Sequence, residues 1–148
     1  MMKRNLIDRI FCSQIVLLFS GIFLLSFYAN GQTTTLEASL QRGKTIYVQR
    51  CVACHQPDGG GVPHMNPPLD GATTVKGKDK FRLIQIIIKG MSDRVEIDGE
   101  FYSNNMAPHA DLTDQQVADV LTYIRNNWSN KAGAVTPGEV KAARAKLK

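Results

Sequence analysis

The feature that most constrains this chain is the five-residue pattern Cys51-Val52-Ala53-Cys54-His55. Two cysteines three positions apart lie on about one turn of a helix, so both sulfur atoms can face one planar ligand. A haem carries vinyl groups on neighbouring pyrrole rings, and each can form a thioether with one of these thiols. His55 would then lie under the iron, where an imidazole nitrogen can ligate it. The pattern is typical of covalent haem attachment.

Other uses of the two cysteines fit less well. A structural zinc ion takes four ligands. Once Cys12 is set aside, only Cys51, Cys54 and three histidines could serve, and their spacing is not that of a zinc finger. A thioredoxin-like redox pair belongs in a βαβ context, which the sequence does not indicate. A structural or zinc-binding module is therefore the least favoured interpretation.

The N-terminus has the organisation of a secretory signal peptide. Lys3, Arg4 and Arg9 precede an apolar stretch over residues 10–29, and small residues precede a cleavage point after residue 31. We predict that residues 1–31 are a signal peptide and that the mature protein is exported to the periplasm. The alternative is an uncleaved anchor, since the apolar stretch is just long enough to span a bilayer although polar residues dilute it.

Cleavage would leave 117 residues, enough for one domain. The formal net charge would fall from +5 to +3, because three basic residues and Asp8 leave with the peptide. Both remaining cysteines belong to the haem pattern. The charge gives no reason to expect a nucleic-acid partner, and its clearest use would be to speed encounter with acidic proteins.

The mature chain reads as helices separated by one long loop and one hairpin. Apolar periodicity and capping signals predict helices over residues 36–51, 78–89, 113–130 and from 136 to the C-terminus. Residues 57–71 are rich in glycine and proline and predict a loop. Asp98-Gly99, between alternating segments over residues 94–102, predicts a short hairpin.

Individual residues predict where two of these helices begin and what two of them contact. Thr113 with Gln116, and Thr136 with Glu139, have the spacing of capping boxes. Gly43 inside the first helix predicts the close approach of another helix. The basic face of the last helix is predicted to be solvated; it consists of Lys141, Arg144, Lys146 and Lys148.

An iron held by one histidine needs a second axial ligand if the site is to be closed. The candidates are Met65, Met91, Met106, His64 and His109. We favour Met106, because it lies in an irregular stretch stiffened by Pro108 just before a capped helix. Met65 and Met91 are interpreted as core gap-fillers. His109 is the main rival, since it lies three residues from Met106.

Taken together, residues 43–128 resemble a class I cytochrome c of the bacterial periplasmic type. The matching features are Gly43 and Tyr47, Cys51–His55, Pro67-Pro68-Leu69, Met106, and the helix that begins at Leu112-Thr113-Asp114. The resemblance implies an all-helical cytochrome c fold around one covalent haem c, with helices crossing near Gly43, Val120 and Tyr123. It also implies that the Pro67 carbonyl accepts a hydrogen bond from His55. One residue departs from the family pattern. Members of this family often have proline directly after the methionine, whereas here Ala107 lies between Met106 and Pro108.

This interpretation divides the chain into a signal peptide (1–31), a cytochrome c domain (36–130) and a C-terminal helical tail (131–148). With Cys51 and Cys54 attaching the haem and His55 and Met106 ligating its iron, the expected function is electron transfer without enzymatic activity. The resemblance implies redox protein partners: a donor dehydrogenase, and an acceptor oxidase or cytochrome. Membrane association is expected only if the N-terminal segment is uncleaved. The alternative is a haem enzyme or gas sensor with an open sixth coordination position, in which His64 or His109 would act as distal acid–base groups.

Overall fold

The computed structural model describes residues 35–147. The predicted signal peptide therefore lies outside the described residues. From Ala38 onward the chain packs as one unit, to which all the elements below belong. Among residues 35–147 no helix has the length and apolar character needed to cross a membrane.

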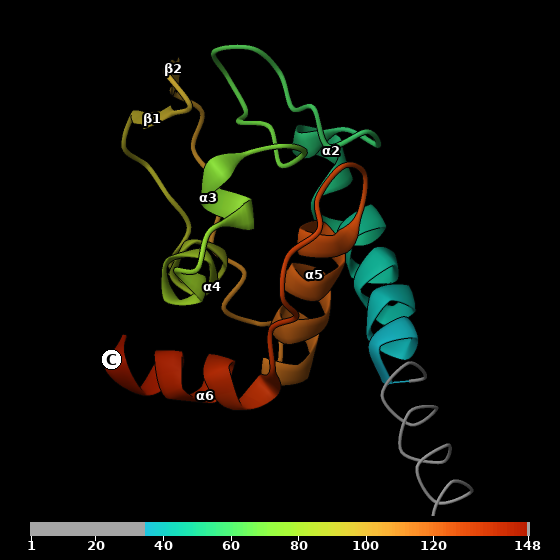
Figure 1. Ribbon diagram of the computed structural model, residues 1–148. Helices are drawn as coiled ribbons and strands as arrows, with labels where there is room; N and C mark the ends of the chain where they lie inside the picture. The colour runs from blue at the N-terminus through green and yellow to red at the C-terminus, as the bar shows by residue number, and fades with distance from the viewer. Residues whose placement is uncertain (1–34, 148) are drawn as a thin grey trace, which may run out of the picture. The chain divides into compact units, whose positions relative to one another are not determined.

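The unit is mainly helical with one small two-stranded sheet, which confirms the predicted fold class (Figure 1). Residues 38–50 are helical. The elements that follow are α2 (Val52–His55), α3 (Thr73–Lys76), α4 (Lys80–Lys89), β1 (Val95–Ile97), β2 (Glu100–Tyr102), α5 (Asp114–Asn126) and α6 (Pro137–Lys146). The hairpin forms as predicted, with β1 and β2 antiparallel and Val95 opposite Tyr102.

The starts of α5 and α6 follow local chemistry, whereas the short helix α3 depends on a contact distant in sequence. Both predicted capping boxes are present, at Thr113 and Thr136. The sequence did not predict the short helix α3, whose first amide, that of Thr73, donates to the hairpin residue Asp98. Helix α5 ends at Asn126 rather than near residue 130. Beyond its end Trp128 has a φ of 52°, and the Asn130 side chain donates back to the Ile124 carbonyl.

Gly43 marks the crossing of helical residues 38–50 with α5, as predicted. A Cβ atom on Gly43 would lie 2.1 Å from the Asp119 carbonyl oxygen and 2.7 Å from the Tyr123 Cβ. Beside this contact the buried Asp119 accepts hydrogen bonds from Ser39, Arg42 and Gln115. Burial alone would raise the pKa of Asp119, but these hydrogen bonds hold it below its usual value.

Helix α6 packs against both α4 and α5, as Figure 1 shows. Its apolar side chains Val140 and Ala143 are buried in the common core. The prediction that its whole basic face is solvated is wrong for Arg144. This side chain pairs with Asp114 at 2.7 Å, because the packing of α6 brings it over the start of α5.

Candidate functional site

The Cys51–His55 pattern begins directly after helical residues 38–50 and includes α2. The His55 amide donates to the Cys51 carbonyl at 2.9 Å, so the pattern forms a helical turn. Cys51 is half-buried and Cys54 is exposed, and both are free thiols that line one cavity. Burial, with a smaller contribution from Cys54, raises the pKa of the Cys51 thiol to about 11. Two thiols on one turn therefore face the same space.

His55 is buried and fixed by one hydrogen bond. Its Nδ1 atom lies 3.0 Å from the Pro67 carbonyl oxygen. A carbonyl only accepts, so Nδ1 carries the proton and Nε2 keeps its lone pair. Burial lowers the pKa of His55, with the Pro67 bond acting in the opposite direction. The imidazole is therefore held neutral and oriented, which is the form that ligates metals.

The loop that carries Pro67, residues 57–71, is folded tightly on itself; we name it the His-side loop. The amides of Leu69 and Asp70 both donate to the Gly59 carbonyl, at 2.7 and 3.0 Å. Gly61 has a φ of 67°, and a Cβ atom there would lie 2.3 Å from the Asn66 oxygen and 2.7 Å from the Pro67 oxygen. Glycine at position 61 is therefore needed for the backbone to pass beside the carbonyl that contacts His55.

Residues just beyond α5 hold this loop from outside. Asn130 is 1% exposed. Its side chain accepts from the Gly71 amide and donates to the carbonyls of Leu69 and Ile124, all at 2.9–3.0 Å. The indole of Trp128 donates to the Pro57 carbonyl at 3.0 Å. Sequence reasoning missed both roles. Asn130 was missed because an asparagine after a helix is usually part of a turn.

The predicted second ligand lies in a different setting. Residues 103–112, which we name the Met-side loop, contain Met106 and His109. Met106 pairs with Met91 through two reciprocal backbone hydrogen bonds of 2.8 and 2.9 Å. Gly90 makes this approach possible: its φ is 71°, and a Cβ atom would lie 2.4 Å from the Met106 carbonyl oxygen. The amide of His109 donates to the Ile87 carbonyl at 2.8 Å.

The five candidate ligands separate into two groups. Met91, Met106 and His109 line the same cavity as Cys51, Cys54 and His55. Met65, by contrast, is 49% exposed, so its interpretation as a core gap-filler is wrong. His64 is exposed at the surface, with Nδ1 3.6 Å from a Glu100 carboxylate oxygen. The structure thus keeps three of the five candidates near the cavity.

The cavity itself has a volume of about 270 Å³ and mostly apolar walls. The walls come from the His-side loop, α3, α4, α5 and the Met-side loop, and include Leu69, Val75, Ile87, Leu112 and Leu121. Within residues 35–147, no three His, Cys, Asp or Glu side chains come together as they would around a bound metal ion. An apolar space bordered by two thiols, one neutral imidazole and thioether sulfur fits a haem, whose macrocycle is apolar and whose iron takes nitrogen and sulfur ligands.

Comparisons with known proteins agree with this geometry. The family model described as Cytochrome c matches residues 40–128. Cytochrome c-552 of Thermus thermophilus is 33% identical over 131 residues, which cover 83% of this chain and 86% of that protein. The cytochrome c subunit of the quinone alcohol dehydrogenase of Gluconacetobacter polyoxogenes is 36% identical over 125 residues, 78% of this chain and 24% of that subunit.

A further relative is the gluconate 2-dehydrogenase cytochrome c subunit of Pantoea cypripedii, 36% identical over 107 residues that cover 70% of this chain and 24% of the subunit. The chain thus spans about a quarter of the length of the dehydrogenase subunits that it matches. Most of its length aligns in every case, and so does most of cytochrome c-552. This chain therefore belongs to the cytochrome c family of electron carriers, whose members bind haem c covalently.

Proposed function

We propose that this protein carries one electron at a time on a haem attached through Cys51 and Cys54, with His55 and Met106 as the axial ligands. The observation that carries the proposal is that all four side chains line one mostly apolar cavity. In addition, the hydrogen bond from His55 Nδ1 to Pro67 leaves the lone pair of Nε2 available to a metal. A haem bound there would supply an iron that alternates between the ferrous and ferric states.

The protein contributes orientation and a mostly apolar environment. His55 is neutral and buried, and a methionine thioether is neutral as well. A closed apolar site disfavours the extra positive charge of ferric iron, and thioether sulfur favours the ferrous state, so both effects raise the reduction potential. The fixed His-side loop limits atomic movement when the charge changes.

Met106 is favoured over Met91 by its packing. Both side chains line the cavity and their backbones are paired, but Met106 also packs against the buried core cluster. Pro108 fixes the backbone two residues further along. A thioether is a weak ligand that gains from such restraint, since a ligand that is already positioned loses less freedom on binding.

The test compares Met106→Ala with Met91→Ala in the holoprotein. Met106→Ala should bind carbon monoxide to the ferrous protein and lower the reduction potential, whereas Met91→Ala should change neither property strongly. The reverse pattern would assign the iron to Met91. If both variants keep the wild-type spectrum, His109→Ala tests the imidazole alternative. Wild-type protein that binds carbon monoxide readily would favour the haem enzyme or sensor instead.

The relatives' names suggest partners. Subunits of alcohol and gluconate dehydrogenases are among the similar proteins, so we propose a dehydrogenase as electron donor and a terminal oxidase or another cytochrome as acceptor, in the periplasm.

Stopped-flow mixing of oxidised protein with a substrate-reduced quinoprotein dehydrogenase should show reduction of the haem. If the modest positive charge assists encounter, the rate of this reduction should fall as the salt concentration rises. Recovery of the protein in the cytoplasmic fraction of cells would contradict the proposed location.

A further inference from the structure

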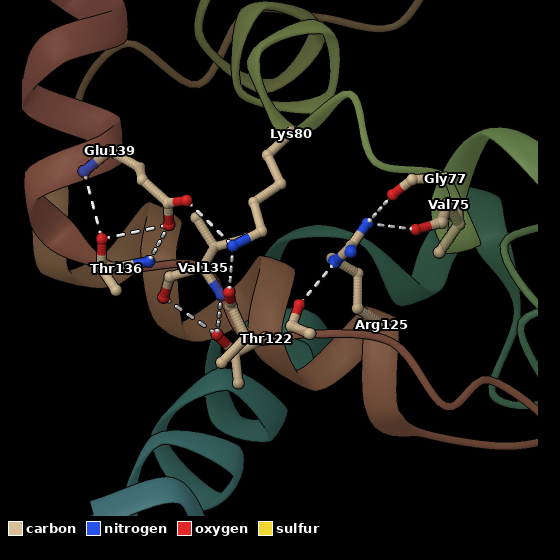
Figure 2. A network of polar contacts seen from close by, with 10 residues as sticks. Val75, Gly77, Lys80, Thr122, Arg125, Val135, Thr136 and Glu139 are labelled. Carbon is tan, nitrogen blue, oxygen red and sulfur yellow. Dashed lines mark hydrogen bonds and ion pairs between the residues drawn. The ribbon is translucent and has the colours of Figure 1, made fainter.

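Helix α6 is fixed to the rest of the unit at its beginning, as Figure 2 shows. Lys80 of α4 donates to the Ala134 carbonyl at 2.6 Å and to the Glu139 carboxylate at 2.9 Å. The Thr122 hydroxyl accepts from the Val135 amide at 3.0 Å. Since Val140 and Ala143 are buried as well, α6 has a defined position from which its last turn can hold another segment.

The buried Arg125 strengthens the same attachment. Its Nε atom donates to the Gly133 carbonyl at 2.8 Å, and Nη1 donates to the carbonyls of Val75 and Gly77 (Figure 2). The segment that leads into α6 is therefore bound to α5 and, through the same guanidinium, to the α3 region. These bonds fix the position of the first residues of α6. Because α6 is one continuous helix of ten residues, its last turn is positioned as well.

From the last turn of α6, Arg144 reaches the end of the Met-side loop. Its Nε atom donates to the Asp114 carboxylate at 2.7 Å, Nη1 donates to the Ala110 carbonyl at 3.4 Å, and Nη2 donates to the Leu112 carbonyl. One guanidinium thus engages three acceptors within five residues. A guanidinium presents several N–H donors in one plane and can therefore bond several acceptors at once, whereas a lysine ammonium is a single compact charge.

The segment held in this way is the one that leads from Met106 to α5. Leu112 is buried and lines the cavity, and His109 lines it as well. At the other end of the segment, Met106 is held by its backbone pairing with Met91. Between these ends the His109 amide donates to the Ile87 carbonyl. Removal of Arg144 takes away one of these few restraints, so the segment gains freedom to move away from the cavity.

We propose that Arg144 is a positioning residue that keeps the Met-side loop closed over the cavity, and thereby keeps Met106 available to the iron. This inference rests on the proposed ligation by Met106. In the absence of Arg144, the open state of the loop is more populated, so an external ligand competes more successfully for the sixth position.

The test is carbon monoxide binding to ferrous holoprotein carrying Arg144→Gln. Because apparent affinity scales with the population of the binding-competent state, we expect a rise of about tenfold. Arg42→Gln is the matched control: it also removes an arginine from an ion pair, with Asp119, but at the distant helix crossing. It should lower the stability to unfolding and leave carbon monoxide affinity unchanged.

The outcomes separate the two proposals. If Arg144→Gln and wild type exclude carbon monoxide equally, the role of Arg144 is overturned and ligation by Met106 stands. If wild type binds carbon monoxide as readily as Met106→Ala, both are overturned. Should Arg144→Gln fail to yield holoprotein, Arg144→Lys is measured instead, because it keeps the charge but cannot engage all three acceptors. A rise in affinity supports the proposal, and an unchanged affinity overturns it.

Discussion

The His-side loop and the Met-side loop both border the cavity, yet they are held in different ways. The His-side loop is fixed by a buried asparagine, an indole hydrogen bond and its own backbone bonds around Gly59. The Met-side loop depends on one backbone pair, on the His109 amide and on Arg144. Its outer part, at Ser103 and Asn104, bonds to the exposed residues His64 and Met65 and to the half-buried Asn66 of the His-side loop.

The difference places rigidity around His55, the proposed strong ligand, and leaves Met106, the proposed weak ligand, on a segment with fewer restraints. Buried, fully satisfied polar groups resist local opening, because opening leaves donors and acceptors without partners. Exposed bonds and single backbone pairs open at lower free energy. Variants on the His side should therefore affect the free energy of unfolding most, and variants on the Met side should affect access to the iron.

The largest expected effect comes from Asn130→Ala. It removes three hydrogen bonds made by a buried side chain and leaves the Gly71 amide and the carbonyls of Leu69 and Ile124 without this partner. Stability of the holoprotein to denaturant should fall by about 3 kcal/mol. The control Asn126→Ala removes one half-buried bond, to the Thr122 carbonyl, and should cost less than 1 kcal/mol. Equal losses would mean that the His-side loop does not depend on Asn130.

Gly61→Ala should have the next largest effect on stability. The added methyl group would press on the oxygens of Asn66 and Pro67, and alanine is strained at a φ of 67°. We expect a loss of about 2 kcal/mol, together with a changed reduction potential because the Pro67 bond to His55 is disturbed. Gly60→Ala is the control, since the nearest atom that a Cβ there would meet is in the flexible Asp58 side chain, at 3.2 Å. A neutral Gly61→Ala would contradict the tight packing of this loop.

Gly90→Ala applies the same change on the Met side. Its methyl group would press on the Met106 carbonyl and on Pro108. Because the Met-side loop can move away, we expect a smaller loss of stability, about 1 kcal/mol, but a clear gain in carbon monoxide binding. Gly99→Ala has a comparable φ of 86° with nothing within 4 Å, so it reports the backbone strain alone. If Gly90→Ala excludes carbon monoxide, the Met side is as rigid as the His side.

The smallest effect concerns pH. Hydrogen bonds from the Ser129 hydroxyl and amide lower the pKa of Asp70 from its usual value of 3.8. A depressed pKa stabilises the fold above about pH 4, and this contribution is lost as the pH falls through the folded-state pKa. Ser129→Ala should therefore cost a few tenths of a kcal/mol at neutral pH. The difference from wild type should shrink in unfolding measurements below pH 4, and a constant difference would contradict the role of Asp70.

The sequence was informative where the causes are local. The cysteine spacing, the two capping boxes and the Asp-Gly turn each depend on residues within a few positions of one another, and the last two form as predicted. Gly43 also predicted its helix crossing, because glycine is unfavourable inside a helix and a close contact gives it a purpose there.

What the sequence could not predict depends on partners far along the chain. The first amide of helix α3, that of Thr73, donates to Asp98, 25 residues away. Asn130 and Arg144 look like ordinary polar residues until the fold brings acceptors to them. The pairing of Met91 with Met106 could not be foreseen either, because it joins two residues far apart in the chain through their backbones. The axial pair itself stays a prediction.

Native-state hydrogen exchange of the holoprotein tests the central contrast most directly. The amides of Gly61, Leu69 and Gly71 report the His-side loop, and those of Met91, Met106 and His109 report the Met side; each is hydrogen-bonded. We predict that the Met-side amides exchange through openings about 2 kcal/mol easier than global unfolding, while the His-side amides approach the global value. Equal protection on the two sides, or weaker protection on the His side, would contradict the proposed division.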